Sequence, residues 1–153
     1  MKQVHLECKP DETLIRALGA SRKVVNHHND KGRVCNILEK RQSEIGMVDE
    51  DPDSSQPTYL KKLTEVEVRY KIRLLTDPQR GHAVIVLCPR LEEWILDVAG
   101  RQKVDVTTFG LPDKPEQLHK LITSRLDQFR KLVEHLLAQE TEPILYLQRL
   151  LNS

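Results

Sequence analysis

The apolar residues in the first half of the chain form short runs separated by stretches with helical spacing. The runs at residues 4–7, 23–28 and 45–48 have the length of strands and predict three of them. Between these runs, apolar side chains recur every three or four residues, which predicts two amphipathic helices. This succession is typical of parallel βαβ units, whose right-handed crossovers bring the ends of all three strands to one edge of a sheet. The helical positions are Leu14, Ile15, Leu18, Val34, Ile37 and Leu38.

Capping residues predict where these two helices begin and end. Asp11 is a good N-cap for the first helix, and Gly19 is expected to end it. Asn29 or Asp30 can cap the second helix. Residues 52–57 consist of Asp, Ser, Gln and Pro without apolar periodicity, so they predict an exposed loop beside the end of the third strand.

The middle of the chain carries two further apolar runs, at residues 66–75 and 82–88. The turn-like sequence TDPQRG separates them, so they predict an antiparallel hairpin or an extension at the edge of the sheet. The second run, HAVIVLC, is continuously apolar and suits a strand covered on both faces. After Pro89, apolar residues at helical spacing predict a helix that ends at Gly100.

The last third of the chain is predicted to be helical. Residues 118–137 predict one long amphipathic helix, and residues 142–151 predict a shorter one. Their apolar side chains are expected to pack on the sheet, although a share of this stripe could bind a partner chain instead. The sequence therefore predicts an α/β fold with a mostly parallel sheet and helices on both faces. We expect an α/β domain over residues 1–100 and a C-terminal helical extension over residues 101–153, packed on the same domain.

The composition limits the class of protein. A chain of 153 residues with 39% hydrophobic and 31% charged residues fits one compact domain. No apolar stretch has the length of a membrane span and the N-terminus has no signal-peptide core, so we expect a cytoplasmic protein with no membrane partner. Cys8, Cys35 and Cys88 are odd in number and lack C-x-x-C spacing, which argues against disulfides and zinc. The net charge of +1 gives no overall attraction to nucleic acid.

Acidic residues follow the third predicted strand. On an extended backbone Asp49 and Asp51 would point to the same side, with Glu50 pointing away. Mg²⁺ is usually held by one or two carboxylates together with water and substrate phosphates, so this D-x-D pair suits a metal site. The alternative is a solvated acidic turn, which the Pro-Asp-Ser sequence that follows also favours.

Glu7 ends the first predicted strand, where its carboxylate can meet those of Asp49 and Asp51. The two aspartates would hold one Mg²⁺, and Glu7 would complete its shell through water or act as a general base. A second ion would stabilise the leaving oxygen. Lys9 could contact a phosphate, although a solvated lysine is the alternative.

Other polar residues are weaker candidates. His27 and His28 are adjacent on a predicted strand and would point to opposite faces, so they are not expected to share a metal ion. His119 is expected to be a surface residue of the long helix. A basic strip along DNA or RNA competes with an ordinary solvated helix face. Its residues are Lys31, Arg33, Lys40 and Arg41.

Three motifs together resemble the Toprim fold, over residues 2–95. The segment ECKPDETLIRAL is similar to the glutamate-glycine start of that family, with an acidic residue opening the following helix, and VDED is similar to its D-x-D. Cys8 stands where many members have glycine. CPRLEEWIL resembles a glutamate-before-tryptophan segment of small Toprim-like proteins from bacterial defence systems.

The resemblance implies a function. Toprim domains are the catalytic domains of topoisomerases, primases and overcoming-lysogenization-type nucleases, and they are Mg²⁺-dependent enzymes that act on nucleic-acid phosphodiesters. Small members of the defence type often work beside an ATPase. For this chain the resemblance implies that Glu7, Asp49 and Asp51 bind Mg²⁺ or Mn²⁺ and catalyse, and it makes Glu92 a candidate additional ligand.

Two classes of function are left open by the sequence. The first is a Mg²⁺-dependent Toprim-type nuclease, acting as a phage-defence effector beside an ATPase. The second is a non-catalytic regulatory or binding subunit that keeps the fold and uses its acidic edge and C-terminal helices for protein contacts. The convergence of Glu7, Asp49 and Asp51 on one point is the feature that discriminates between them.

Overall fold

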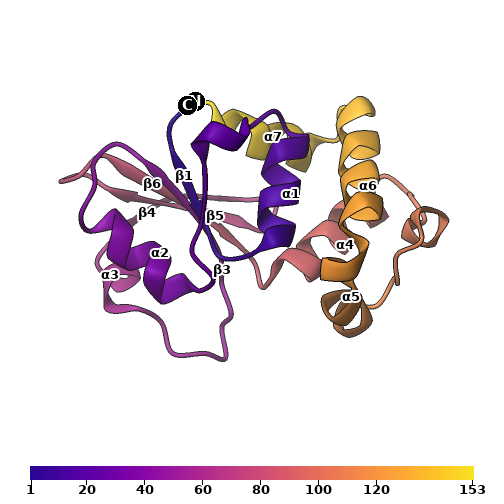
Figure 1. The fold of residues 1–153 in the computed structure, drawn as a ribbon, viewed down its shortest axis with the longest axis horizontal. Coiled ribbons are helices and arrows are strands. Elements are labelled where there is room, and N and C mark those ends of the chain that lie inside the picture. The colour runs from indigo at the N-terminus through magenta and orange to yellow at the C-terminus, as the bar shows by residue number, and fades with distance from the viewer.

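The computed structural model describes residues 1–153 and contains a six-stranded mixed sheet (Figure 1). The strand order is β2-β1-β3-β6-β5-β4. The first four strands in this order run parallel, and β5 and β4 are antiparallel additions at one edge. The strands are β1 (Val4–Leu6), β2 (Val25–His27), β3 (Ile45–Asp49), β4 (Thr64–Arg69), β5 (Ile72–Asp77) and β6 (His82–Leu87).

Helices cover both faces of the sheet, as Figure 1 shows, with α2 and α3 on one side and the other helices on the opposite side. The predicted α/β fold, with a mostly parallel sheet and helices on both faces, is confirmed. The helices are α1 (Lys9–Ala17), α2 (Lys31–Leu38), α3 (Thr58–Lys61), α4 (Leu91–Arg101), α5 (Pro115–Leu121), α6 (Leu126–Ala138) and α7 (Glu142–Leu151), with 3₁₀ turns η1 (Arg22–Val24), η2 (Val106–Phe109) and η3 (Ile122–Arg125).

Side-chain alternation along the strands divides the apolar core in two. In β6, Ile85 and Leu87 belong to a large core beneath α1, α4 and the C-terminal helices, whereas Val84 and Val86 face a smaller core beneath α2 and α3. Both faces of β6 are therefore buried, as its continuous apolar sequence predicts. On β3, a Cβ added to Gly46 would lie 2.8 Å from Leu38 Cδ1, so the absence of a side chain lets α2 pack closely on the sheet.

The antiparallel pairing predicted between residues 66–75 and 82–88 is confirmed by β5 and β6. The first run is not a single strand, however, because it is itself a hairpin. β4 and β5 are joined at Tyr70 and Lys71, which have φ values of 53° and 58°. Two positive φ values are typical of the tight turn that suits the twist of a hairpin, but Asn and Gly are its usual residues. Tyr and Lys therefore gave no turn signal.

The predicted single helix at residues 118–137 is also wrong. It consists of α5 and α6 with the 3₁₀ turn η3 between them. A 3₁₀ helix has about three residues per turn, so side chains three residues apart lie on the same side of it. The apolar spacing of the sequence therefore continues from α5 through η3 into α6 without a visible break. Most of the apolar side chains expected to pack on the sheet lie in the large core, but Leu121 is 37% exposed. The buried ones are not accessible to a partner, and they are Leu118, Ile122, Phe129, Leu132, Val133 and Leu136.

Two helix boundaries differ from the prediction. Asp11 is not the N-cap of α1, because the helix already begins at Lys9 and Cys8 occupies the cap position. The Asp11 carboxylate instead accepts hydrogen bonds from the Cys8 backbone N–H and thiol, at 3.2 and 3.1 Å. α4 continues past Gly100 to Arg101. Gly19, with φ of +112°, does end α1 as predicted.

The large core joins the predicted α/β domain and the predicted C-terminal extension. It includes Leu6 and Trp94 from the first hundred residues, and Phe129 and Leu147 from the C-terminal helices. The division at residue 100 stays a prediction. None of the helices combines the length and apolar composition that are needed to cross a bilayer.

Candidate metal centre

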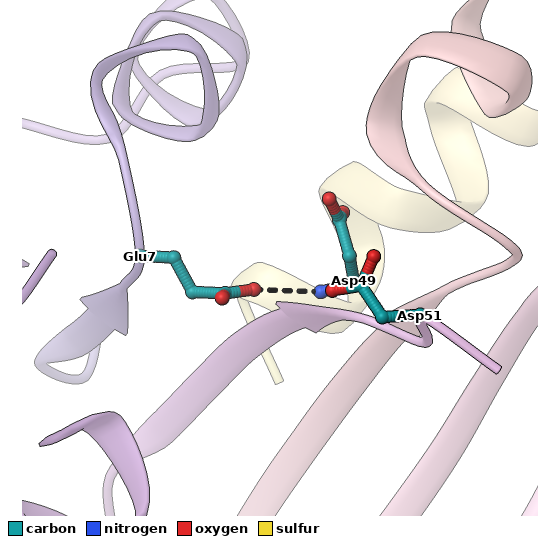
Figure 2. Close-up of side chains that lie close together, drawn as sticks. All are labelled: Glu7, Asp49 and Asp51. Carbon is teal, nitrogen blue, oxygen red and sulfur yellow. Dashed lines mark hydrogen bonds between the residues drawn. The ribbon is translucent and has the colours of Figure 1, made fainter. Parts of the chain in front are cut away.

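Three acidic side chains converge at the carboxyl ends of β1 and β3. Glu7 follows β1, Asp49 ends β3 and Asp51 lies two residues further on. One carboxylate oxygen from each lies within 4.8 Å of the others (Figure 2). Because β1 and β3 are neighbouring parallel strands, their ends meet at the same edge of the sheet. The structure thus brings together the three residues that the sequence selects, and we refer to them as the acidic triad.

Asp49 is held by two backbone hydrogen bonds. Its Oδ1 accepts the N–H of Leu91 at 3.0 Å, where α4 begins. Its own N–H donates to Glu7 Oε2 at 2.9 Å, the bond drawn in Figure 2. Strand β3 and helix α4 therefore fix two of the three carboxylates, and each keeps one oxygen free of these bonds.

The backbone conformation that places Asp51 beside Glu7 and Asp49 was not predicted from the sequence. The expected extended backbone is wrong, because Asp51 has a φ of 46° in the left-handed region. The chain turns after β3, and the Asp51 N–H donates to the carbonyl oxygen of Pro89 at 3.0 Å. Alternation along a strand is thus not the reason why Asp49 and Asp51 lie close together.

Burial makes the ionised forms of Glu7 and Asp49 unfavourable without a counter-charge. It raises the pKa of Asp49 to about 9, and the charges of Asp11, Glu7 and Glu92 contribute to the increase. Burial also raises the pKa of Asp11 to about 7. The pKa of Glu7 is raised by burial as well, although its bond to the Asp49 N–H and the charge of Lys31 lower it. In the absence of a cation, Asp49 holds its proton at neutral pH.

Glu92, the candidate additional ligand, is a buried carboxylate that is not among the three residues whose oxygens lie within 4.8 Å of one another. It lies in the first turn of α4, is 5% exposed, and its Oε1 is 2.7 Å from His119 Nδ1 on α5. His119 is a surface residue, as expected, with a side chain that is 56% exposed, and it also links α5 to this carboxylate. Glu92 Oε2 is buried and has no hydrogen-bond partner. Leaving a buried oxygen without a hydrogen-bond partner costs about 1–3 kcal/mol, or more for a charged group.

Asp11 belongs to this group too, although the sequence pattern suggested only a helix cap. Its charge raises the pKa of Asp49, and the charges of Glu7 and Glu92 raise the pKa of Asp11. The available signal was its spacing, since it stands four residues after Glu7 and in the first turn of α1. Asp11 and Glu92 approach Asp49 from the two helices that follow β1 and β6.

Lys31, not Lys9, is the lysine beside the triad. Lys9 is exposed and lines a groove between α1 and α6, which contains no member of the triad. The proposed phosphate contact of Lys9 stays a prediction. Lys31 Nζ lies 3.7 Å from Asp51 Oδ2, and Lys31 is only 9% exposed. Lys31 is therefore not part of an exposed basic strip.

The two adjacent histidines lie outside the triad. His27 is exposed, and His28 Nε2 is 2.8 Å from Nδ1 of the buried His5. His5 Nε2 in turn lies 2.7 Å from Glu44 Oε1. This hydrogen-bonded chain satisfies the polar atoms of His5 within the sheet, so it explains the histidines without a metal ion.

Comparison with known proteins does not assign the chain to a family. A scan against protein-family models, a search of curated proteins and a search of solved structures each find no match to the chain.

Proposed function

We propose that this chain is a Mg²⁺- or Mn²⁺-dependent hydrolase of nucleic-acid phosphodiesters, a nuclease of Toprim type. The observation that carries the proposal is the convergence of Glu7, Asp49 and Asp51 within 4.8 Å. Hard divalent cations prefer carboxylate oxygens, and Mg²⁺ often uses one or two of them together with a substrate phosphate. The resemblance of the motifs to Toprim proteins supports the choice of a phosphodiester substrate.

The residues present fit a divalent cation. Asp49 has a pKa of about 9, so its carboxyl group is deprotonated at neutral pH only when a nearby cation stabilises the carboxylate. The unpartnered Oε2 of Glu92 is a buried oxygen that a cation would satisfy. Both features are unfavourable in a purely structural acidic edge.

The three carboxylates take different roles in this proposal. Asp49 and Asp51 would hold the ion, which when bound polarises a phosphoryl oxygen and acidifies a coordinated water. Glu7 already accepts the Asp49 N–H through Oε2, so Oε1 is the atom left to hold or deprotonate the attacking water. Its raised pKa brings it closer to the working range of a general base.

Partners and location form the more distant part of the proposal. A nucleic-acid substrate, an ATPase partner, a role in phage defence and a cytoplasmic location all come from the resemblance to small Toprim-like proteins. Glu92 is proposed as an additional ligand because of its unpartnered oxygen and its influence on the pKa of Asp49.

One observation favours the alternative of a non-catalytic regulatory subunit. Glu7 Oε2 and Asp49 Oδ1 accept backbone N–H groups, so part of the acidic triad also stabilises the junction of β1, β3 and α4. A protein that had lost catalysis would keep these bonds. Its partner contacts could not use the buried apolar side chains of α6, such as Phe129 and Leu132.

Calorimetric titration with Mn²⁺ tests the proposed site. The wild type should bind Mn²⁺, and a variant carrying both Asp49→Asn and Asp51→Asn should not. Asp53→Asn is a matched control, because Asp53 is exposed in the same loop and lies outside the triad. Absence of binding by the wild type at millimolar Mg²⁺ and Mn²⁺ would exclude the isolated chain as a metal-dependent enzyme.

A further inference from the structure

Asp51 is the one triad member that no strand holds in place. β3 ends at Asp49, and Asp51 adopts a left-handed φ of 46° in the loop that follows. This conformation is unfavourable for a residue with a Cβ, by about 1 kcal/mol or more. Contacts from outside the local backbone must therefore keep the Asp51 carboxylate near Glu7 and Asp49.

Gln56 makes most of these contacts. Its Nε2 is a donor to the carbonyl oxygens of Glu50, Asp51 and Ser54, at 3.0, 3.0 and 3.1 Å. The loop thus folds around one side-chain amide. Its Oε1 accepts a hydrogen bond from Lys31 Nζ at 3.1 Å, which ties the loop to the start of α2.

Lys31 completes the connection. Its Nζ also donates to the carbonyl oxygen of Glu50 at 3.0 Å and lies 3.7 Å from Asp51 Oδ2. Lysine is almost never fully buried unless it is paired, yet Lys31 is only 9% exposed. Its ammonium group is therefore committed to the loop and to Asp51.

We propose that Lys31 and Gln56 are positioning residues that hold residues 50–56 in the conformation that places the Asp51 carboxylate beside those of Glu7 and Asp49. This inference rests on the proposed metal site and names what keeps it assembled. Neither residue is a ligand, since both act through the Asp51 backbone and carboxylate. Loss of a group that orients a metal ligand typically weakens metal binding 10- to 100-fold.

Two variants separate position from charge. Gln56→Met removes the amide but no charge, and we expect it to raise the dissociation constant for Mn²⁺ at least about tenfold. Lys31→Met removes a positive charge from beside the site, which alone would tighten cation binding. Weaker binding by Lys31→Met therefore means that lost positioning outweighs the charge effect. Lys31→Arg, which keeps the charge and the donors, should recover part of the affinity.

The control is Lys40→Met, which removes the charge of an exposed lysine just past the end of α2, the helix that Lys31 begins. It should leave the dissociation constant for Mn²⁺ within about twofold of the wild type, since screened surface charges act weakly. A loss of affinity in Lys40→Met equal to that in Lys31→Met would overturn the assignment of Lys31.

Hydrogen exchange of the Asp51 amide gives a readout that needs no metal. In EDTA this amide, bonded to the Pro89 carbonyl oxygen, should exchange faster in Gln56→Met and Lys31→Met than in the wild type. Unchanged exchange in both variants overturns the proposal, as does faster exchange with unchanged affinity for Mn²⁺. If the wild type fails to bind Mn²⁺, the proposed metal site fails, and exchange alone decides whether Lys31 and Gln56 hold the loop.

Discussion

Glu7 and Asp49 are joined by a 2.9 Å hydrogen bond from the Asp49 N–H to Glu7 Oε2, across 42 positions of sequence. The bond fixes the Glu7 carboxylate to the backbone of β3 instead of leaving it at a solvated strand end. The two oxygens of Glu7 therefore differ in role: Oε2 accepts the backbone N–H of Asp49, and Oε1 is left to contact water or a metal ion.

Glu7→Gln should abolish cleavage and leave the fold intact. Glutamine can still accept the Asp49 N–H through its carbonyl oxygen, so the free energy of unfolding should stay within about 0.5–1 kcal/mol of the wild type. It cannot take a proton from water, and losing a general base typically lowers the rate 10²- to 10⁴-fold. Cleavage of plasmid DNA and of RNA with Mg²⁺ or Mn²⁺ measures the effect, with and without an ATPase encoded beside this chain.

Glu134→Gln is the matched control for that assay, because Glu134 is exposed on α6 outside the acidic triad. EDTA should stop all cleavage by the wild type. Cleavage that survives EDTA, or equal rates for Glu7→Gln and the wild type, would contradict the metal-dependent mechanism. A chain that never cleaves but binds the ATPase would favour the regulatory subunit.

Mg²⁺ or Mn²⁺ should stabilise the folded chain. An ion that binds only the folded state adds about 2.7 kcal/mol to the free energy of unfolding at a hundredfold excess over its dissociation constant. Thermal unfolding with and without the ion measures this shift, which should vanish when Asp49→Asn and Asp51→Asn are combined. A shift of the same size in that double variant would place the ion elsewhere.

The pKa of Asp49 makes stability depend on pH in the metal-free chain. This pKa is raised from 3.8 to about 9, so between these values the folded state keeps a proton that the unfolded state has released. Stability from Asp49 is therefore complete below about pH 4 and declines as the pH rises towards 9. Asp11, with a pKa of about 7, adds a decline that ends near pH 7.

Unfolding in EDTA at pH 5, 7 and 9 tests this dependence. Asn at position 49 can still accept the Leu91 N–H but cannot titrate, so Asp49→Asn should gain stability relative to the wild type as the pH rises. Parallel pH profiles for the two proteins would mean that Asp49 has an ordinary pKa. Mn²⁺ affinity of the wild type should increase over the same range, since binding displaces the proton.

The sequence was sufficient to predict the features that depend on repeated patterns. Apolar periodicity and helix-ending residues predicted the βαβ order, and that order placed Glu7 and Asp49 at one sheet edge. Features that depend on single contacts were not predictable. The Tyr70–Lys71 turn has no turn residues, and the partners of Glu92 and Lys31 lie far away in sequence.

Asp51 illustrates the limit most clearly. Its place beside Asp49 was predicted from strand alternation, but the strand ends first and a left-handed turn brings the residue there. The position of Asp51 depends on Gln56 and Lys31, whose spacing from it follows no regular period. The expected proximity of Asp49 and Asp51 is thus observed, but it arises from a local geometry that the sequence pattern did not predict.

A pair of glycine substitutions tests how closely α2 is packed on the sheet. In Gly46→Ala, the new Cβ would lie 2.8 Å from Leu38 Cδ1 inside the smaller core, so the side chain or α2 must shift. Overpacking of this kind costs about 1–3 kcal/mol. Gly100→Ala is the opposite case, because a Cβ there meets nothing within 4 Å and the residue lies within α4. Alanine should stabilise that helix by about 0.5–1 kcal/mol. Urea unfolding of both variants measures the two signs, and a Gly46→Ala protein as stable as the wild type would show that α2 does not approach β3 this closely.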